Sequence, residues 1–258
     1  MDRRKQIGAI AETDEEKMCL IRVCDRMERA EEREMPAASA FLSPREQALV
    51  QQILPKMRFW GGTEGADRKI AYYLPEYLEK EEYFADGPIG CIRGEFYEAN
   101  SLSHRDILGA LMGAGLRRDA IGDIYVYEKH CVFFLLSDLA AYLLENFTGA
   151  GRQHLHLQEI PCASVEKPLQ NMKTMRVTVS SLRLDAVLSA AFHMSRGKAV
   201  EAVNGGRVNV NSLSCLKSDR AVKILDEISL RGAGKLRIME LHGQTKKDRT
   251  AITVGIYL

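Results

Sequence analysis

The 258-residue sequence lacks several patterns that mark common classes of protein. No apolar run approaches the roughly 20 residues that a membrane-spanning helix needs, and the basic start, Met1 to Lys5, is not followed by the apolar core of a signal peptide. The six cysteines form neither a C-x-x-C pair nor a clustered framework. These absences predict a cytoplasmic protein with reduced cysteines and no membrane partner.

Signatures of catalysis are missing as well. Neither a G-x-G-x-x-G pattern nor a Walker lysine occurs. His104-Arg105-Asp106 has the letters of a kinase catalytic loop, but the downstream asparagine, the Asp-Phe-Gly and the glycine-rich loop are absent. His154 and His156 have no nearby carboxylate or thiolate partner, so they do not indicate a metal site. The sequence predicts no catalytic residue, no metal and no small-molecule cofactor.

The formal net charge of +1 conceals an uneven distribution of charge. From Lys173 to the end the chain has fifteen lysines and arginines against seven acidic residues, whereas residues 1–172 have 21 basic and 28 acidic residues. Because phosphate contacts dominate nucleic-acid affinity, the basic part favours a polyanion as partner. The acidic part argues against a protein that coats RNA along its full length.

The first 80 residues predict three helices. Apolar residues recur at helical spacing over residues 14–33, and the charged face of this helix is expected to be solvated. Ser43-Pro44-Arg45-Glu46 has the form of a capping box, which predicts a helix from Pro44 to about Met57. Residues 64–73 predict a third helix that ends near Pro75. We therefore expect residues 1–80 to form a helical N-terminal domain.

Residues 81–162 have a different pattern, in which strand candidates alternate with two helices. The helices begin at Ser103 and at Ser137 or Asp138, and the strand candidates cover 89–92, 122–127, 131–136 and 155–160. The resulting order is that of ferredoxin-like domains and of RNA-recognition motifs. However, the aromatic signature that those motifs use for base stacking is missing. We expect most of the aromatic residues here to be buried: Tyr125, Tyr127, Phe133 and Phe134.

The stretch from Arg183 to Lys235 carries the main functional signal. Apolar spacing predicts a helix over residues 183–191, and Ser195 is a favourable N-cap for a second helix that stops at Asn204-Gly205-Gly206. Further strands are expected at 208–210, 222–224, 228–230 and 236–241, with a polar loop at 244–250 and a closing strand at 251–257. Arg196 and Lys198 therefore lie at a helix N-terminus, where free N–H groups and the helix dipole favour an anion.

This stretch resembles the S4 domain, an RNA-binding module. The resemblance rests on four blocks in the order and spacing of that family: Arg183-Leu184-Asp185, Ser195-Arg196, Gly206 to Asn211, and Asp226-Glu227-Ile228. In the S4 family two helices and the following strand present one basic face to structured RNA. The resemblance implies RNA contacts by Arg183, Ser195, Arg196, Lys198, Arg207, Asn211, Lys217, Arg231 and Lys235. Asp185 is expected to cap a helix or to pair with an arginine.

A second resemblance covers nearly the whole chain. The segments His104 to Leu111, Gly122-Asp123-Ile124, Phe41 to Gln47 and Gly61 to Lys69 are similar to the YlmH-type S4-domain proteins of bacteria. We expect a monomeric, non-enzymatic binder of structured RNA, and the resemblance implies ribosomal RNA or transfer RNA as its partner. Its partner would be a large ribosomal subunit obstructed by peptidyl-tRNA, and its process translation quality control. His104 and Arg105 would contact RNA or a neighbouring domain, or pair internally with Asp106 or Asp123.

The expected fold class is α+β with three domains. These are a helical N-terminal domain over residues 1–80, a ferredoxin-like (RRM-like) domain over 81–162, and an S4 domain over 174–242 with a C-terminal strand to 258, preceded by a linker at 161–175. Two alternatives stay open for the function. One is an RNA-modifying enzyme of the pseudouridine-synthase type, because S4 domains are often appended to such enzymes. The other is a cell-division-associated interaction scaffold, which predicts binding that barely responds to salt.

Overall fold

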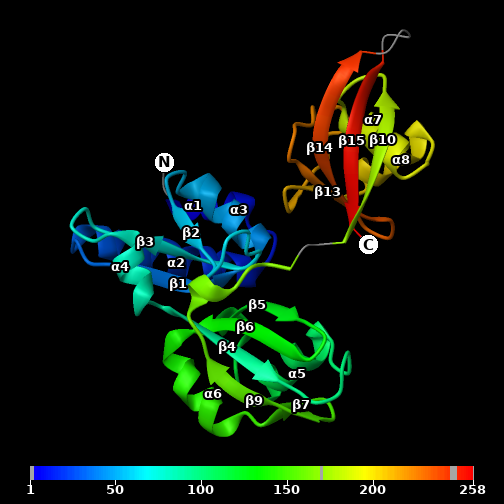
Figure 1. Cartoon of the computed structure of the whole chain (residues 1–258). Coiled ribbons are helices and arrows are strands. Elements are labelled where there is room, and N and C mark those ends of the chain that lie inside the picture. Colours follow the sequence, from blue (N-terminus) through cyan, green and yellow to red (C-terminus); the bar gives the residue numbers. More distant parts are fainter. Residues whose placement is uncertain (1–2, 169–170, 245–248, 258) are drawn as a thin grey trace. The chain divides into compact units, whose positions relative to one another are not determined.

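A computed structural model describes residues 3–168, 171–244 and 249–257 (Figure 1). The chain divides into two compact units, Met1–Pro168 and Leu169–Leu258. Both contain helices and antiparallel sheets, so the expected α+β class is confirmed. Within the ranges described, no helix is long and apolar enough to cross a membrane.

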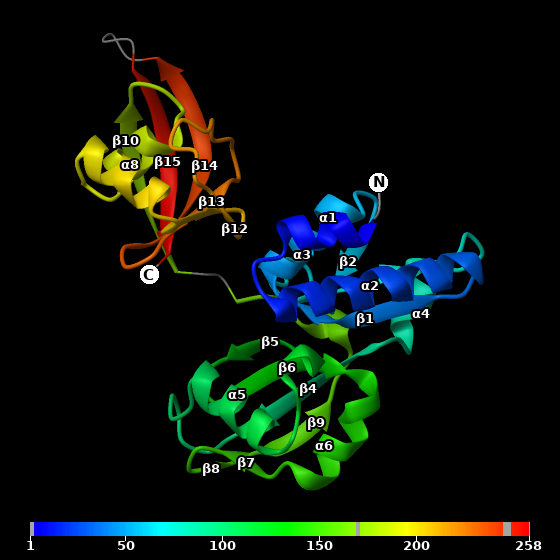
Figure 2. The same cartoon turned by 180° about the vertical axis from the view of Figure 1, so that it is seen from behind.

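The N-terminal part of the first unit contains a sheet that the sequence did not predict. Its helices are α1 (Arg3–Ile10), α2 (Asp14–Glu32), α3 (Pro44–Ile53) and α4 (Lys80–Ala85). Three strands, β1 (Ala37–Leu42), β2 (Arg58–Trp60) and β3 (Lys69–Tyr73), form a sheet in the order β1-β3-β2. Strands β1 and β2 are labelled in Figure 2. The helix expected over residues 64–73 is therefore wrong, and a purely helical N-terminal domain is wrong with it.

Tertiary pairing explains this difference. Strand β3 is the central strand, and its neighbours on both sides pair with it antiparallel. Ile70 and Ala71 are fully buried, so a segment whose local pattern also suits a helix gains more by completing the sheet. The capping box at Ser43 is confirmed, but α3 ends at Ile53, two residues before Pro55.

The second part of the first unit has the expected order of strands and helices. It comprises β4 (Ile89–Glu95), α5 (His104–Gly113), β5 (Ile121–Val126), β6 (His130–Leu136), α6 (Ala140–Asn146) and β9 (His156–Glu159). The sheet is antiparallel in the order β5-β6-β4-β9, and a short hairpin, β7 (Gly149–Ala150) and β8 (Gln153–His154), precedes β9. Neither Ser137 nor Asp138 caps α6, since a 3-10 turn at Ser137–Leu139 leads into the helix without a side-chain cap.

Both faces of this four-stranded sheet are covered. On one face Phe133 packs with Ile107 of α5 and Leu143 of α6. On the other face Phe134 packs with Phe41 and Ile70 from the N-terminal strands. Phe133 and Phe134 are fully buried, Tyr125 is buried and Tyr127 is partly buried, so the expectation that these aromatic residues lie mostly in the core is confirmed.

Asp123 fastens the loop before β3 to strand β5. Its two carboxylate oxygens accept the backbone N–H groups of Asp67 (2.7 Å) and Arg68 (2.9 Å), and the Tyr125 hydroxyl also donates to it (3.0 Å). The Arg68 guanidinium donates to the carbonyls of Ile121 and of residue 41 at 2.9 and 3.1 Å. The two parts of the first unit are therefore joined by polar contacts as well as by the shared core.

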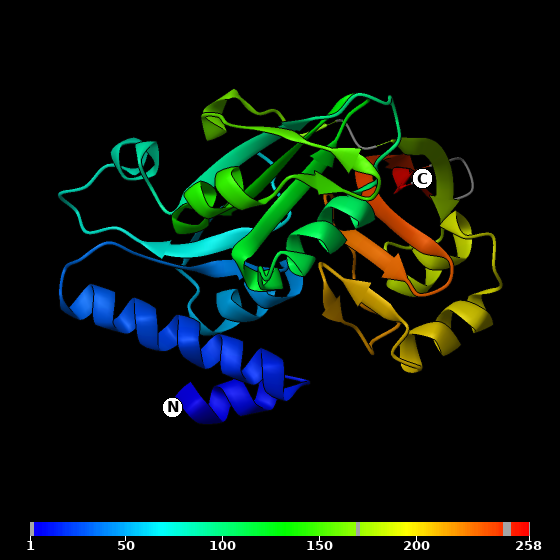
Figure 3. The ribbon, with the colours of Figure 1, turned by 90° about the horizontal axis from the view of Figure 1, so that it is seen from below.

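The second unit is one six-stranded sheet with two helices. Its strands are β10 (Met172–Val179), β11 (Val208–Val210), β12 (Leu213–Ser214), β13 (Glu227–Leu230), β14 (Gly234–Gln244) and β15 (Thr250–Tyr257), in the order β10-β15-β14-β13-β11-β12. The helices α7 (Leu184–Ala191) and α8 (Arg196–Asn204), coloured yellow in Figure 3, lie together beside the strands, and their apolar faces form a core with them.

Two expectations are corrected, one for the segment that leads into this unit and one for the unit itself. The linker expected at 161–175 contains a 3-10 turn, Cys162–Ser164, and the start of β10, whose Val177 and Val179 join the core. Residues 222–224 are not a strand, because only an isolated bridge between Ala221 and Arg183 forms there. Most of the polar loop expected at 244–250 lies outside the described residues, while Gln244 and Thr250 end and begin strands.

Candidate nucleic-acid interface

Asp185 lies between the two arginines that the sequence singled out. Arg183 is the N-cap of α7 and Arg196 is the first residue of α8. Arg183 Nε lies 3.2 Å from Asp185 Oδ1, and Arg196 Nε donates to Asp185 Oδ2 at 3.1 Å. The Asp185 side chain is only 3% exposed, whereas the arginine side chains are 42% and 51% exposed. The expected pairing of Asp185 with an arginine is confirmed.

The protonation of Asp185 follows from these contacts. Burial alone would raise the pKa of its carboxyl, but hydrogen bonds from Arg183 and Arg196 outweigh burial and lower that pKa below its ordinary value. The carboxylate is therefore charged at neutral pH and fixes two guanidinium groups. The N–H groups that do not face Asp185 are left to meet an anion from outside.

The N-termini of the two helices differ in what they offer to a ligand. The first N–H groups of α7 are taken by backbone carbonyls, since Leu184 donates to Arg220 (2.9 Å) and Asp185 to Ser218 (3.0 Å). Lys217 is exposed on this same loop. At α8 the cap is a side chain, because the Ser195 hydroxyl accepts from Lys198 N at 3.3 Å. Ser195 is thus confirmed as the N-cap of the second helix.

A second cluster of basic residues lines a depression of about 350 Å³ beside α8. Lys198, Arg207 and Arg231 line it, together with one acid, Glu201. The backbone N–H of Arg231 donates to the carbonyl of Arg207 at 2.9 Å, which brings the chain before β11 against the chain after β13. Three cations from distant positions in the sequence are therefore gathered at one place.

Asn211 and Lys235 have other partners. The Asn211 amide donates to Asp226 at 2.8 Å and accepts the backbone N–H of Glu227 at 2.9 Å, which holds a turn whose Asn211 has a φ of 51°. Lys235 Nζ lies 2.6 Å from Glu227 Oε2 and 4.8 Å above the ring of Tyr257. Because its neighbour Leu236 is fully buried in the core against the helices, Lys235 lies on the opposite face of the sheet.

Sequence reasoning missed Arg220. It is exposed, its carbonyl accepts from the start of α7, and the next residue, Ala221, bridges to Arg183. No motif marks this position, because its nearness to Arg183 depends on a loop that returns to the helix start after more than thirty residues.

In the first unit, His104 and Arg105 open helix α5. Asp106 is occupied in a capping box, where it accepts the N–H of Ser103 at 2.9 Å and the Ser103 hydroxyl at 2.7 Å. The carboxylate of Asp123 accepts hydrogen bonds from the loop before β3 and from Tyr125. Among the described residues, neither His104 nor Arg105 makes a side-chain hydrogen bond or an ion pair, so the internal pairing considered for them is not formed. Burial and, next, the nearby Arg118 lower the pKa of His104.

The structure also bears on metal and thiol chemistry. All six cysteines are free. In the parts of the chain that are described, no cluster of three or more His, Cys, Asp or Glu residues is arranged to hold a metal ion.

Comparison with known proteins identifies relatives of this chain. A family model described as "Putative RNA-binding domain in YlmH" matches residues 96–164. The ribosome-associated protein quality control protein P2 of Bacillus subtilis (strain 168) is 34% identical over 218 residues, which cover 83% of this chain and 84% of that protein. A solved structure, the cell division protein ylmH from Streptococcus pneumoniae, aligns with 58% of this chain and 94% of its own at 18% identity and a TM-score of 0.48. On the extent of its identity to the Bacillus subtilis protein and the match of its middle segment, the chain belongs to the YlmH family.

Proposed function

We propose that this protein binds structured RNA without modifying it and acts on ribosomes in translation quality control. Its RNA would be ribosomal RNA or transfer RNA, and its natural partner a large ribosomal subunit obstructed by peptidyl-tRNA. The name of the Bacillus subtilis relative, a ribosome-associated quality control protein, supports the ribosomal part of this proposal.

The observation that carries the proposal is the pair of exposed guanidinium groups held by one buried carboxylate. Arg183 and Arg196 are oriented before any ligand arrives, so binding a phosphate costs less side-chain entropy than it would with free arginines. Lys198, Arg207 and Arg231 extend the same basic surface around the depression beside α8. Such a surface recognises the shape and phosphates of folded RNA more than its base sequence.

We further propose a division of labour among the three expected domains. Residues 174–242 would supply the S4-type contact with RNA. Residues 81–162, which we assign as ferredoxin-like, and residues 1–80 would meet a second surface and orient the protein. His104 and Arg105 are candidates for that second contact because both are exposed and neither forms a hydrogen bond or an ion pair with Asp106 or Asp123.

The experiment is a salt titration of RNA binding with single substitutions. Arg183→Ala and Arg196→Ala should each weaken binding to large-subunit ribosomal RNA or transfer RNA by about 1 to 3 kcal/mol, the range for a hydrogen bond to a charged group. Arg176→Ala is the matched control, because Arg176 is exposed on β10 and its loss changes the net charge equally. If both test variants bind as the wild type does at every salt concentration, the assigned face is wrong.

The same titration separates the alternative functions. A scaffold that recognises other proteins would bind RNA weakly and with little response to salt, whereas a protein held by phosphate contacts loses affinity steeply as salt rises. An RNA-modifying enzyme would leave altered nucleotides in a transcript incubated with stoichiometric protein. Mass spectrometry of that transcript should detect no change if the protein only binds.

A further inference from the structure

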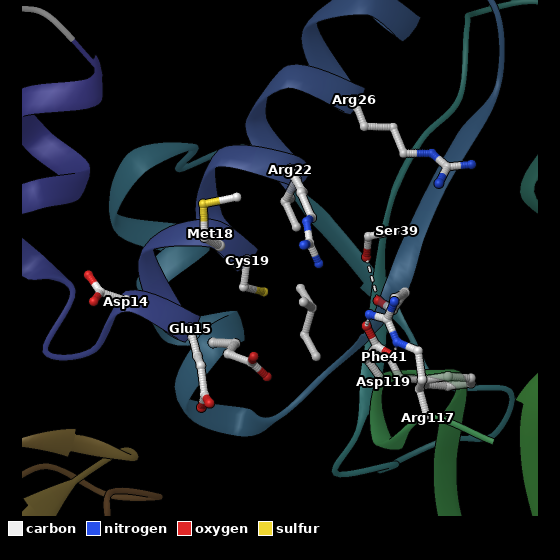
Figure 4. Close-up of a pocket in the computed structure, with 14 residues that line it drawn as sticks. Asp14, Glu15, Met18, Cys19, Arg22, Arg26, Ser39, Phe41, Arg117 and Asp119 are labelled. Atoms are coloured by element: carbon white, nitrogen blue, oxygen red, sulfur yellow. Dashed lines mark hydrogen bonds and ion pairs between the residues drawn. The ribbon is translucent and has the colours of Figure 1, made fainter. Parts of the chain in front are cut away.

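A groove lies in the first unit, between helix α2 and strand β1. It has a volume of about 750 Å³ and continues to the turn at residues 117–119 (Figure 4). Its apolar lining includes Val23, Phe41 and the exposed Met18. Strand β1 is an edge strand of its sheet, and its residues from Ser39 to Leu42 line the groove. The first unit thus has a concave site large enough for a ligand.

The basic side of this groove contains arginines without partners. Arg22 and Arg26, one turn apart on α2, line it and are exposed. Among the described residues, their side chains make no hydrogen bond or ion pair. Arg117 faces them from the other wall, where it pairs with Asp119 (Figure 4). Three guanidinium groups from two distant segments therefore border the same space.

Of the acids that line the groove, Asp119 pairs with Arg117, and the others form no ion pair with Arg22 or Arg26 among the described residues. Glu46 is committed to the capping box of α3, where it accepts the N–H of Ser43 at 2.6 Å. Beside it, burial and then the charge of Glu46 raise the pKa of the Cys19 thiol to about 12, so Cys19 is neutral. Asp14 and Glu15 lie in the first turn of α2, about two turns before Arg22. The groove is consequently acidic towards one end and basic towards the other.

Further cations lie next to the basic end. Arg118 follows Arg117, and its carbonyl accepts from Arg68 at 3.2 Å. Both guanidinium groups donate to backbone carbonyls instead of carboxylates. Burial first, and then the charge of Arg118, lower the pKa of Arg68 to about 10, although the charges of Glu46, Asp123 and Asp119 act in the opposite direction. Arg22, Arg26, Arg68, Arg117 and Arg118 are gathered here against three acids, Glu46, Asp119 and Asp123, although residues 1–172 are acidic as a whole. An anion at this rim would relieve the repulsion between the arginines.

We propose that the basic end of this groove, defined by Arg22, Arg26 and Arg117, binds the phosphodiester backbone of RNA as a second contact of the protein. This inference rests on the proposed function. The four-stranded sheet β5-β6-β4-β9 supports this proposal. Both of its faces are covered, so it offers no surface on which RNA bases could stack. An RNA that binds the first unit must therefore contact it away from the sheet faces. Arg22 and Arg26, whose side chains have no partner among the described residues, provide such a contact at the border of the groove.

The first test compares two double variants of the full-length chain that lose the same charge. Arg22→Gln with Arg26→Gln removes the proposed contacts. Lys17→Gln with Arg29→Gln removes two exposed cations of the same helix that lie outside the groove. With large-subunit ribosomal RNA as probe, the groove variant should make the slope of log affinity against log salt shallower by about 1.4 to 1.8. The control variant should keep the wild-type slope. Equal slopes in the two variants overturn the proposal.

The second test identifies what occupies the groove. Met18 lines it with 47% of its surface exposed, and Met35 lies outside it with 57% exposed. A photoreactive p-benzoylphenylalanine in place of Met18 should crosslink to RNA on purified large subunits, and the same group in place of Met35 should crosslink much less. Crosslinks from position 18 to a protein, or equal RNA yields at both positions, contradict RNA as the occupant.

Failure of this inference can be told from failure of the proposed function. If the wild-type chain does not bind ribosomal or transfer RNA, the proposed function fails and the groove has no RNA to contact. If Arg183→Ala and Arg196→Ala weaken binding while the groove variant behaves like its control, only the groove proposal fails. Melting temperatures of the groove variant and of its control should match the wild type, because the side chains of Arg22, Arg26, Lys17 and Arg29 make no hydrogen bond or ion pair among the described residues.

Discussion

The carboxylate of Asp185 and the guanidinium of Arg196 meet at 3.1 Å although they lie eleven positions apart in the sequence. This contact joins the start of α7 to the start of α8. Since Arg183 shares the same carboxylate, one buried acid determines where two exposed cations point. An acidic residue within a basic surface can thus be needed for anion binding.

Replacement of Asp185 tests this role directly. Asp185→Asn makes the protein more basic by one charge, so long-range attraction alone would strengthen RNA binding. We expect weaker binding, and a free energy of unfolding lower by about 1 to 3 kcal/mol, because a buried charged acceptor is lost. RNA affinity and urea denaturation monitored by circular dichroism measure the two effects.

The control for Asp185 is Asp219→Asn. Asp219 is exposed on the loop near the start of α7, and its loss changes the net charge equally. This control should bind RNA as well as the wild type or slightly better. If Asp185→Asn behaves in the same way, the orientation of the arginines does not matter for binding.

A second prediction concerns two cations near the same hairpin. Arg231 lines the depression beside α8, whereas Lys235 is engaged with Glu227 on the other face of the sheet. Arg231→Ala should weaken RNA binding by up to about 1 kcal/mol at low salt and less at high salt, as for an exposed charge. Lys235→Ala should leave RNA affinity unchanged within twofold. Filter binding of both variants at one low and one high salt concentration decides between the two faces.

The sequence predicted an element correctly where the local pattern of residues favours the same structure as the tertiary contacts do. Ser43, Ser103 and Ser195 each precede a helix and cap it, because a capping motif acts within four residues. Strand β3 was mistaken for a helix since its burial depends on β1 and β2, which are remote in sequence. Strand β10 was missed for the same reason, as it gains a partner only when β15 folds beside it.

The candidate site was predictable to a similar extent. The arginines at positions 183 and 196 could be named because short motifs contain them. Arg220 could not be named, and neither could the groove arginines Arg22 and Arg26, which on a helical wheel look like part of a solvated face. Their relevance depends on what lies across from them, namely Arg117 from a different part of the unit.

A third prediction concerns the acid stability of the second unit. Burial would raise the pKa of Glu227, but hydrogen bonds from Lys235, Tyr257 and Arg237 outweigh it and lower this pKa from 4.5 to about 2. The stabilisation is therefore complete above pH 4.5 and is lost as the pH falls from 4.5 towards 2. Allowing for solvent screening, we expect a loss of about 1 to 2 kcal/mol.

Hydrogen exchange of the core amides of β13 and β14, measured between pH 6 and pH 3 and corrected for intrinsic rates, reports this loss. Glu227→Gln is expected to be less stable than the wild type at pH 6 and to show a smaller further decrease at pH 3. An equal decrease in both proteins would assign the acid sensitivity to other groups.

The last prediction concerns the junction within the first unit, where the acceptor oxygens of Asp123 bind two backbone N–H groups and the Tyr125 hydroxyl. Asp123→Asn replaces one acceptor oxygen with an NH₂ group that faces a donor, so the free energy of unfolding should fall by about 1.5 to 3 kcal/mol. Trp60, the sole tryptophan, belongs to this unit, so its fluorescence during urea denaturation follows this unit alone. Asp138→Asn, an exposed change of equal charge, should leave the midpoint unchanged. Since Arg68 of this junction donates to the carbonyl of Arg118, the residue after Arg117, Asp123→Asn should also reduce crosslinking from position 18 under conditions in which the unit remains folded. If stability falls and crosslinking does not, the groove forms without this junction.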